Sequence, residues 1–164
     1  MKLSTGRLLS WLAILLLTAC AQPARLRGEA DSHRDDFSGR LALSVQSQPP
    51  QSFAAAFELR GNPQTGELIL ATPLGSTLAR INWDAGTARL KTATEERSFS
   101  TLDALLERLT GTAIPAIALF DWLRGRDNAV PGWQADLSRW AEGRVSARRD
   151  TPQPLAELRI VLEK

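Results

Sequence analysis

The chain has 164 residues, of which 43% are hydrophobic and 23% are charged, and one of them is a cysteine. Lys2 and Arg7 are the only charged residues ahead of Cys20, so the chain from Cys20 onward carries 18 basic and 18 acidic side chains. This balance removes the electrostatic argument for nucleic acid or an anionic membrane surface as a partner. The remaining length suits a single domain.

The first nineteen residues have the pattern of a secretory signal. A basic start is followed by an apolar run over residues 8–17, which is too short to be interpreted first as a membrane-spanning helix. The run leads into Leu-Thr-Ala-Cys at residues 17–20, which resembles the bacterial lipobox, in which the cysteine is lipidated. We therefore predict a lipoprotein signal over residues 1–19 and lipidation of Cys20. An ordinary signal followed by an incidental cysteine is the alternative.

Residues 20–36 are predicted to form a lipidated polar tether, because they combine Pro, Gly, Ser and both charges with few apolar side chains. The residue after the cysteine is Ala21. An Asp at this place resembles an inner-membrane retention signal, whereas Ala resembles outer-membrane sorting. The expected location is thus the periplasmic face of a Gram-negative outer membrane, with residues 37–164 as the folded domain.

Apolar and polar residues alternate between residues 40 and 92, which is the period of half-buried β-strands. We predict strands at residues 40–47, 52–60, 66–72, 76–83 and 87–92. Short turns rich in Pro, Gly and Asn separate them and indicate an antiparallel meander with one apolar face. Three more strands are predicted at residues 133–137, 140–148 and 155–162.

One turn of this meander carries a large apolar residue. Pro73 and Gly75 occupy the second and fourth positions of a predicted type I turn, and Leu74 lies between them. The Leu74 side chain should therefore point into water. A single exposed leucine is common in proteins and by itself indicates no function.

Two helices are predicted between the two groups of strands, because the apolar spacing there changes to that of a helix. The first follows a sequence resembling a capping box, from Ser100 to Asp103, and ends before Gly111. The second has Pro115 as its first residue and stops at Gly125. This order indicates an α+β fold in which the helices lie across the concave face of a curled sheet. The apolar residues then either fill a core or line a cavity.

The sequence shows no pattern typical of catalysis. His33, the only histidine, lies in the predicted tether with the pair Asp35-Asp36, and Glu95-Glu96 falls in a turn ahead of the first helix. Adjacent side chains point to opposite faces of a strand, so neither carboxylate pair converges on one site, as general acid–base chemistry requires. The common nucleophile, phosphate-loop and zinc motifs are missing from the sequence. We predict a protein that is not an enzyme and has no metal or cofactor.

Two motifs carry a resemblance to a known family. Residues 72–77 read TPLGST and residues 110–125 read TGTAIPAIALFDWLRG. Together with the lipobox, they resemble the outer-membrane lipoprotein receptor family LolB over about residues 39–125, and weakly as far as Trp133. The family usually has Asn before the Pro-Leu-Gly turn, where this chain has Thr72.

The resemblance implies an incomplete antiparallel β-barrel with a two-helix lid, inserted between strands, around a hydrophobic cavity. It implies a monomer that accepts triacylated lipoproteins from a soluble LolA-like periplasmic carrier and places them in outer-membrane lipid. LolA-like carriers share the fold but have no lipid anchor, so Cys20 separates the two. A scaffold lipoprotein that binds a protein partner, or a carrier of another apolar ligand, remains an alternative.

The resemblance also implies the positions of the functional residues. Pro73, Leu74 and Gly75 match the family's loop that contacts the membrane during insertion. The residues expected to line the acyl cavity or its lid are Phe53, Phe57, Leu70, Ile81, Leu102, Leu105, Leu106, Leu109, Ile117, Phe120 and Leu123.

Overall fold

The computed structural model describes residues 35–163, so the predicted signal, Cys20 and most of the predicted tether lie outside the described residues. The strands of the described part are β1 (Asp35–Val45), β2 (Gln51–Gly61), β3 (Gly66–Ala71), β4 (Thr77–Trp83), β5 (Ala88–Thr92), β6 (Glu96–Phe99), β7 (Trp133–Asp136), β8 (Arg144–Arg149) and β9 (Ala156–Leu162). The helices are α2 (Leu102–Thr110) and α3 (Ala116–Leu123), with a short 3₁₀ helix η3 (Trp140–Glu142). All of them belong to the unit His33–Lys164.

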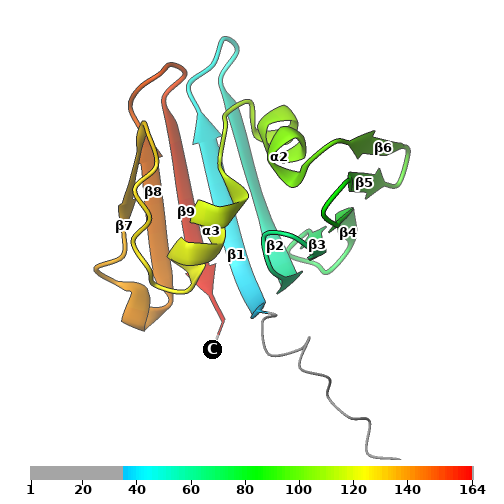
Figure 1. Cartoon of the computed structure of the whole chain (residues 1–164), viewed down its shortest axis with the longest axis horizontal. Coiled ribbons are helices and arrows are strands. Elements are labelled where there is room, and N and C mark those ends of the chain that lie inside the picture. The colour runs from blue at the N-terminus through cyan, green and yellow to red at the C-terminus, as the bar shows by residue number, and fades with distance from the viewer. Residues whose placement is uncertain (1–34, 164) are drawn as a thin grey trace, which may run out of the picture. The chain divides into compact units, whose positions relative to one another are not determined.

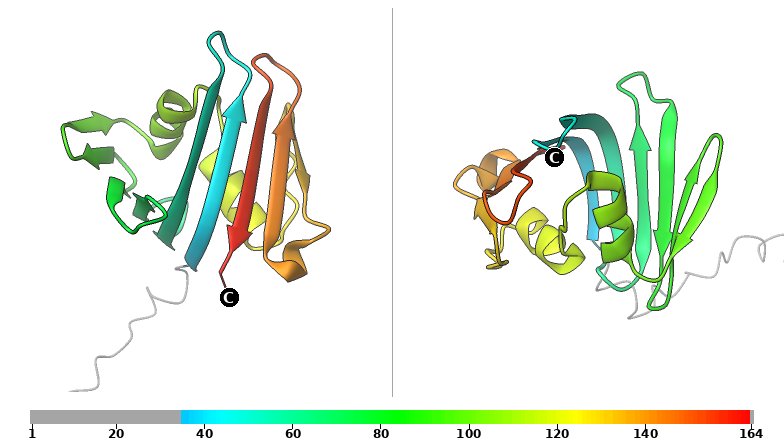
Figure 2. Two further views of the ribbon diagram at one scale, coloured as in Figure 1. Left: turned by 180° about the vertical axis from the view of Figure 1, so that it is seen from behind. Right: turned by 90° about the horizontal axis from the view of Figure 1, so that it is seen from above.

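The strands form one antiparallel sheet in the order β6-β5-β4-β3-β2-β1-β9-β8-β7. The first five strands form the predicted meander and β6 extends it, while β9 returns to pair with β1. The two edge strands, β6 and β7, do not pair with each other, so the sheet stays open. It curls around the two helices, which lie on its concave side (Figures 1 and 2). The predicted α+β fold with a curled, unclosed meander is therefore confirmed.

The two helices begin and end at positions set by local hydrogen bonds. Thr101, one residue later than the predicted start, caps α2, because its hydroxyl accepts from Ala104 N at 3.1 Å. Gly111 ends α2 with a φ of 66°, the left-handed conformation that favours glycine. Pro115 is the N-cap of α3 and not its first residue.

The side chain of Asp103 caps the start of the second helix instead of the first. Its Oδ1 accepts a hydrogen bond from Ala116 N, at 2.8 Å, although a capping box would turn this side chain back to α2. The N-terminus of α3 has no side-chain cap of its own. The carboxylate of Asp103 therefore links α2 to α3 and satisfies one of the free N–H groups at the start of α3.

Three predicted boundaries differ from the structure. β6 was predicted as part of a turn, but it pairs with β5 over four residues. Trp140 begins η3, so the strand that follows starts only at Arg144. β1 begins at Asp35, inside the predicted tether, because Asp35 and Asp36 pair with Gly61 and Arg60 of β2. The start of β1 depends on its pairing with the far end of β2, which local patterns do not reveal, whereas β6 forms a hairpin with the adjacent β5 and η3 is closed by local hydrogen bonds.

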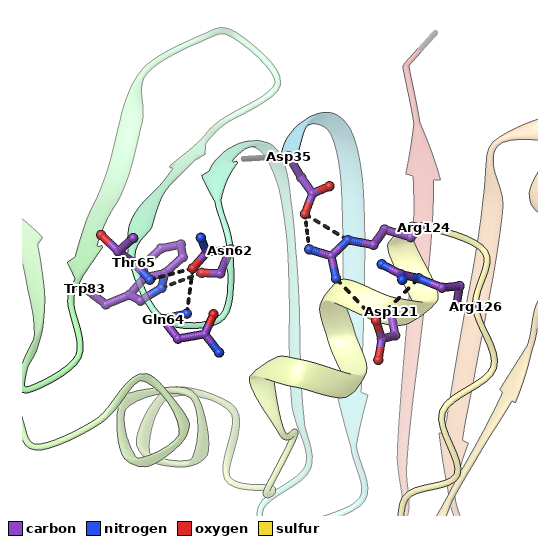
Figure 3. Close-up of polar contacts among 8 residues, drawn as sticks. All are labelled: Asp35, Asn62, Gln64, Thr65, Trp83, Asp121, Arg124 and Arg126. Atoms are coloured by element: carbon purple, nitrogen blue, oxygen red, sulfur yellow. Dashed lines mark hydrogen bonds and ion pairs between the residues drawn. The ribbon is translucent and has the colours of Figure 1, made fainter. Parts of the chain in front are cut away.

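The register divides the sheet into two ends. The starts of β1 and β3 and the ends of β2 and β4 lie together at one end, which we call the closed end. There the indole of Trp83 donates to the carbonyl of Asn62 at 2.9 Å (Figure 3). Gly66 is required beside it, because a Cβ on Gly66 would lie 2.5 Å from the Trp83 ring.

Arg124 fastens the C-terminal end of α3 to the closed end of the sheet (Figure 3). Its Nε lies 2.9 Å from Oδ2 of Asp35, its Nη2 bonds the same oxygen, and its Nη1 lies 3.3 Å from Asp121 Oδ1. The guanidinium also covers the Phe120 ring at 5.6 Å. The hydrogen bond with Asp35 is the main reason why the pKa of Arg124 is raised above its usual value, because this bond favours the charged guanidinium.

We expect Asp35→Asn to lower the free energy of unfolding by about 1–2 kcal/mol, because both side chains of the pair are only about one-fifth exposed. Asp36→Asn is the matched control. Its carboxylate is 71% exposed and lies 3.5 Å from Arg60, so the change should cost roughly 0.5 kcal/mol or less. Urea unfolding of both variants measures the difference, and equal losses would contradict the role of Asp35.

Candidate functional site

An apolar cavity of about 390 Å³ lies between the concave face of the sheet and the two helices. Of the residues predicted to line it, the structure brings nine together around this space. They are Phe53, Phe57, Leu70, Ile81, Leu102, Leu106, Leu109, Phe120 and Leu123. The apolar residues of this part of the chain therefore do not simply fill a core, since they leave a space of ligand size.

Leu105 and Ile117, which are predicted to line the cavity or its lid, belong to the two helices, but neither side chain is among those that line the cavity. Leu105 is fully buried in the core, and it points about 100° away from Leu106 around the helix axis. Ile117 is 55% exposed and lies six residues before Leu123, about 120° away around α3. Only one side of each helix faces the cavity, and the spacing of the leucines alone does not show which residues lie at the border of that side.

Other lining residues come from strands that the prediction did not connect to the site. Leu41 and Leu43 of β1 pair with Ile160 and Leu158 of β9, and all four line the cavity. The alternation within each strand marks them as inward-facing. The sequence therefore shows that these side chains face inward. Only the pairing of β1 with β9 shows that they lie in the same wall of the cavity.

The mouth of the cavity lies at the end of the sheet opposite to the closed end. Phe53, Leu78 and Leu109 line the cavity and are about two-fifths exposed, so they mark its rim. Leu78 is the extra residue of a register shift between β3 and β4, where Leu70 pairs with Ala79 and Ala71 with Thr77. The rim also includes Thr92, Glu95 and Thr110, the polar residues among those that line the cavity.

The loop with Leu74 joins β3 to β4 at this mouth end. Gly75 N donates to Thr72 O at 2.9 Å, which closes the predicted four-residue turn. Leu74 is not among the residues with positive φ, whereas Gly75 has a φ of 86°; this is the pattern of a type I turn followed by a left-handed glycine. Thr72 Oγ1 accepts from Ser76 N at 3.1 Å and braces the loop. Leu74 is 95% exposed, four residues before Leu78 of the rim.

Most of the side chains that line the cavity are apolar. No group of three His, Cys, Asp or Glu side chains in residues 35–163 is placed to hold a metal ion. No helix within the described range is both long and apolar enough to span a membrane. The chemical character of the site is therefore that of an apolar container with a short polar rim.

Comparison with known proteins decides the family. The family model described as "Outer membrane lipoprotein LolB" matches residues 35–157, which include both helices and every cavity-lining residue except Leu158 and Ile160 of β9. The chain belongs to the LolB family.

Individual LolB proteins agree with this assignment. The outer-membrane lipoprotein LolB of Dechloromonas aromatica is 38% identical over 70% of this chain and 63% of its own length. That of Bordetella petrii is 35% identical over 82% of this chain and 80% of its own length. The chain thus spans less than two thirds of the first relative and four fifths of the second.

Membership in the LolB family places this chain among the lipid-anchored lipoproteins of the outer membrane. The predicted resemblance, carried by the TPLGST turn and the second helix, is confirmed. The attachment of lipid at Cys20 and the membrane-contact role of Leu74 remain predictions, because the first lies outside the described residues and the second depends on behaviour at a bilayer.

Proposed function

We propose that this protein receives triacylated lipoproteins from a soluble LolA-like carrier, holds their acyl chains in the cavity and inserts them into the outer membrane. The observation that carries the proposal is an open apolar cavity of about 390 Å³ with a 95% exposed leucine on a braced turn beside its mouth. The site offers burial to an acyl chain and no reactive groups. Transfer then needs only a higher affinity of the chains for each successive site.

The size of the cavity supports a lid role for the helices. A cavity of about 150 Å³ takes up one benzene molecule, so a space of about 390 Å³ suits roughly sixteen carbon atoms, or one acyl chain. A client with three chains requires a wider space. Hydrogen bonds join each strand of the sheet to its neighbours along the whole strand order. The helices are instead held by single side-chain contacts, such as Asp103 with the start of α3 and Arg124 with Asp35 of β1. The helices are therefore the part that we expect to move.

A fluorescent acyl probe tests this function directly. The protein should bind the probe, and a triacylated lipoprotein should displace it while free phospholipid competes poorly. No uptake of the probe would favour the alternative of a scaffold lipoprotein with a closed core. Equal competition by both lipids would favour a general carrier of apolar ligands.

We expect Cys20→Ala, made behind a cleavable signal, to yield a soluble periplasmic protein that still accepts lipoprotein from its carrier. Stable anchoring requires about two lipid chains, which only a lipidated cysteine would supply, whereas the cavity lies wholly within the folded unit. Cell fractionation and a transfer assay with the purified soluble protein measure the two properties. A variant that cannot accept client would show that the anchor takes part in binding.

A further inference from the structure

Glu95 carries the only charge among the side chains that line the described cavity. It lies in the turn between β5 and β6 and forms an ion pair with Arg97, whose Nε is 2.9 Å and whose Nη2 is 2.7 Å from Glu95 Oε2. The two side chains are 42% and 50% exposed, so water and ligands reach them. An ion pair is unexpected at the edge of an apolar cavity, because an acyl chain that binds beside it must displace water from charged groups.

The pairing of β5 with β6 shows which way this ion pair faces. Arg97 is the register partner of Leu90, which lines the cavity, so Arg97 stands on the concave face. Glu96 is the register partner of Lys91 and stands on the opposite, convex face. The two adjacent glutamates therefore differ in position, because Glu95 lines the cavity and Glu96 does not.

The other polar groups of the rim are already engaged. The Thr92 hydroxyl lies 3.3 Å from Glu95 O, and the Thr110 hydroxyl lies 2.8 Å from Leu106 O. Both contacts of Arg97 with Glu95 use one carboxylate oxygen, Oε2. Oε1 of Glu95 is thus the acceptor that the rim presents to the polar end of a bound lipid.

The chemistry of that polar end distinguishes the lipids that the cavity will meet. The acylated cysteine of a lipoprotein ends in neutral esters and amides, and its amide N–H groups can donate to a carboxylate. A phospholipid brings a phosphate anion to the same place. A carboxylate facing a phosphate is repelled, and like-charge contacts of this kind are a common way to exclude a wrong partner.

We propose that Glu95, positioned by Arg97, is a specificity-determining residue that favours lipoprotein heads and excludes phospholipid phosphates from the cavity mouth. This rests on the proposed lipoprotein-receptor function. The ion pair with Glu95 also offsets the positive charge of Arg97, which would otherwise attract a phosphate.

The test compares Glu95→Gln with Glu96→Gln, two changes of the same size and charge on opposite faces of the sheet. Each purified protein is offered a synthetic triacylated lipopeptide and fluorescent phosphatidylglycerol. We expect Glu95→Gln to increase the affinity for phosphatidylglycerol roughly threefold to tenfold relative to the lipopeptide. Glu96→Gln should leave the ratio unchanged. The gain should shrink in 1 M salt, where the screening length falls to about 3 Å.

The possible results separate this inference from the proposed function. If wild type binds the lipopeptide and Glu95→Gln shows the wild-type ratio, the specificity role of Glu95 is overturned while the receptor function stands. If wild type binds neither lipid, the proposed function itself fails. Arg97→Gln provides a second variant should Glu95→Gln not fold, as judged by circular dichroism. It removes a cation and leaves the Glu95 carboxylate unpaired, so it should reduce phosphatidylglycerol binding further, and a rise would contradict the proposal.

Discussion

Leu74→Glu should abolish the delivery of lipoprotein to liposomes while leaving both the fold and the acceptance of client from the carrier intact. The fold should tolerate the change because the side chain is 95% exposed and the loop is held by Thr72, Gly75 and Ser76 through hydrogen bonds that the substitution does not touch. Acceptance should persist because Leu74 is not among the residues that line the cavity. The loss should therefore appear only at the membrane.

The physical reason is the transfer of the side chain into hydrocarbon. A fully buried leucine gains roughly 1.5–3 kcal/mol, whereas a carboxylate meets a large desolvation cost in the same place. Because the loop stands at the mouth end of the sheet, its insertion would bring the cavity opening to the acyl chains of the bilayer. Leu74→Ile and Leu74→Phe should retain most of the activity, since apolar area is what the step requires.

A two-step transfer assay measures this, first from carrier to receptor and then from receptor to liposome. Val161→Glu is the matched control, because Val161 is 48% exposed on β9 and its register partners Arg40 and Arg144 would compensate the new charge. The control should transfer at the wild-type rate in both steps. A Leu74→Glu protein that delivers normally, or that fails already in the first step, would show that Leu74 is an ordinary exposed leucine.

Phe120→Ala should lower both the stability of the protein and its retention of acyl chains. Phe120 is 1% exposed, lines the cavity, and packs edge-on against Trp83 with ring centroids 6.3 Å apart. Removal of a buried phenylalanine typically costs about 3–5 kcal/mol, and the lower end is expected here because one side of the ring already faces open space. The widened cavity would also make fewer contacts with a bound chain.

Leu105→Ala separates these two effects. Leu105 is fully buried but does not line the cavity, so its loss should cost about 2–5 kcal/mol without changing the affinity for an acyl probe. Urea unfolding and probe titration of both variants give the comparison. An unaltered probe affinity in Phe120→Ala, together with a large loss of stability, would place Phe120 in the core and not in the cavity wall.

The local pattern of the chain determined most of its elements and one functional feature. Strict alternation defines the inward faces of β1 to β5, and the change to helical spacing after Thr101 defines α2 and α3. Pro73 and Gly75 determine a turn that exposes Leu74 to solvent, since Pro has a fixed φ and Gly readily adopts the positive φ that ends the turn. These features depend on neighbours a few residues apart, so they can be read without the fold.

Tertiary structure alone decided whether the apolar residues close a core or surround a space. That outcome depends on β9 returning to β1, on the distance at which α2 and α3 cross the sheet, and on contacts such as Arg124 with Asp35, which are 89 residues apart. The same long-range packing turned Leu105 and Ile117 away from the cavity. It also placed Glu95 at the mouth, although the sequence indicated only a solvated turn. Spacing fixes the direction of a side chain relative to its own element, whereas a cavity forms only between elements whose separation no local pattern encodes.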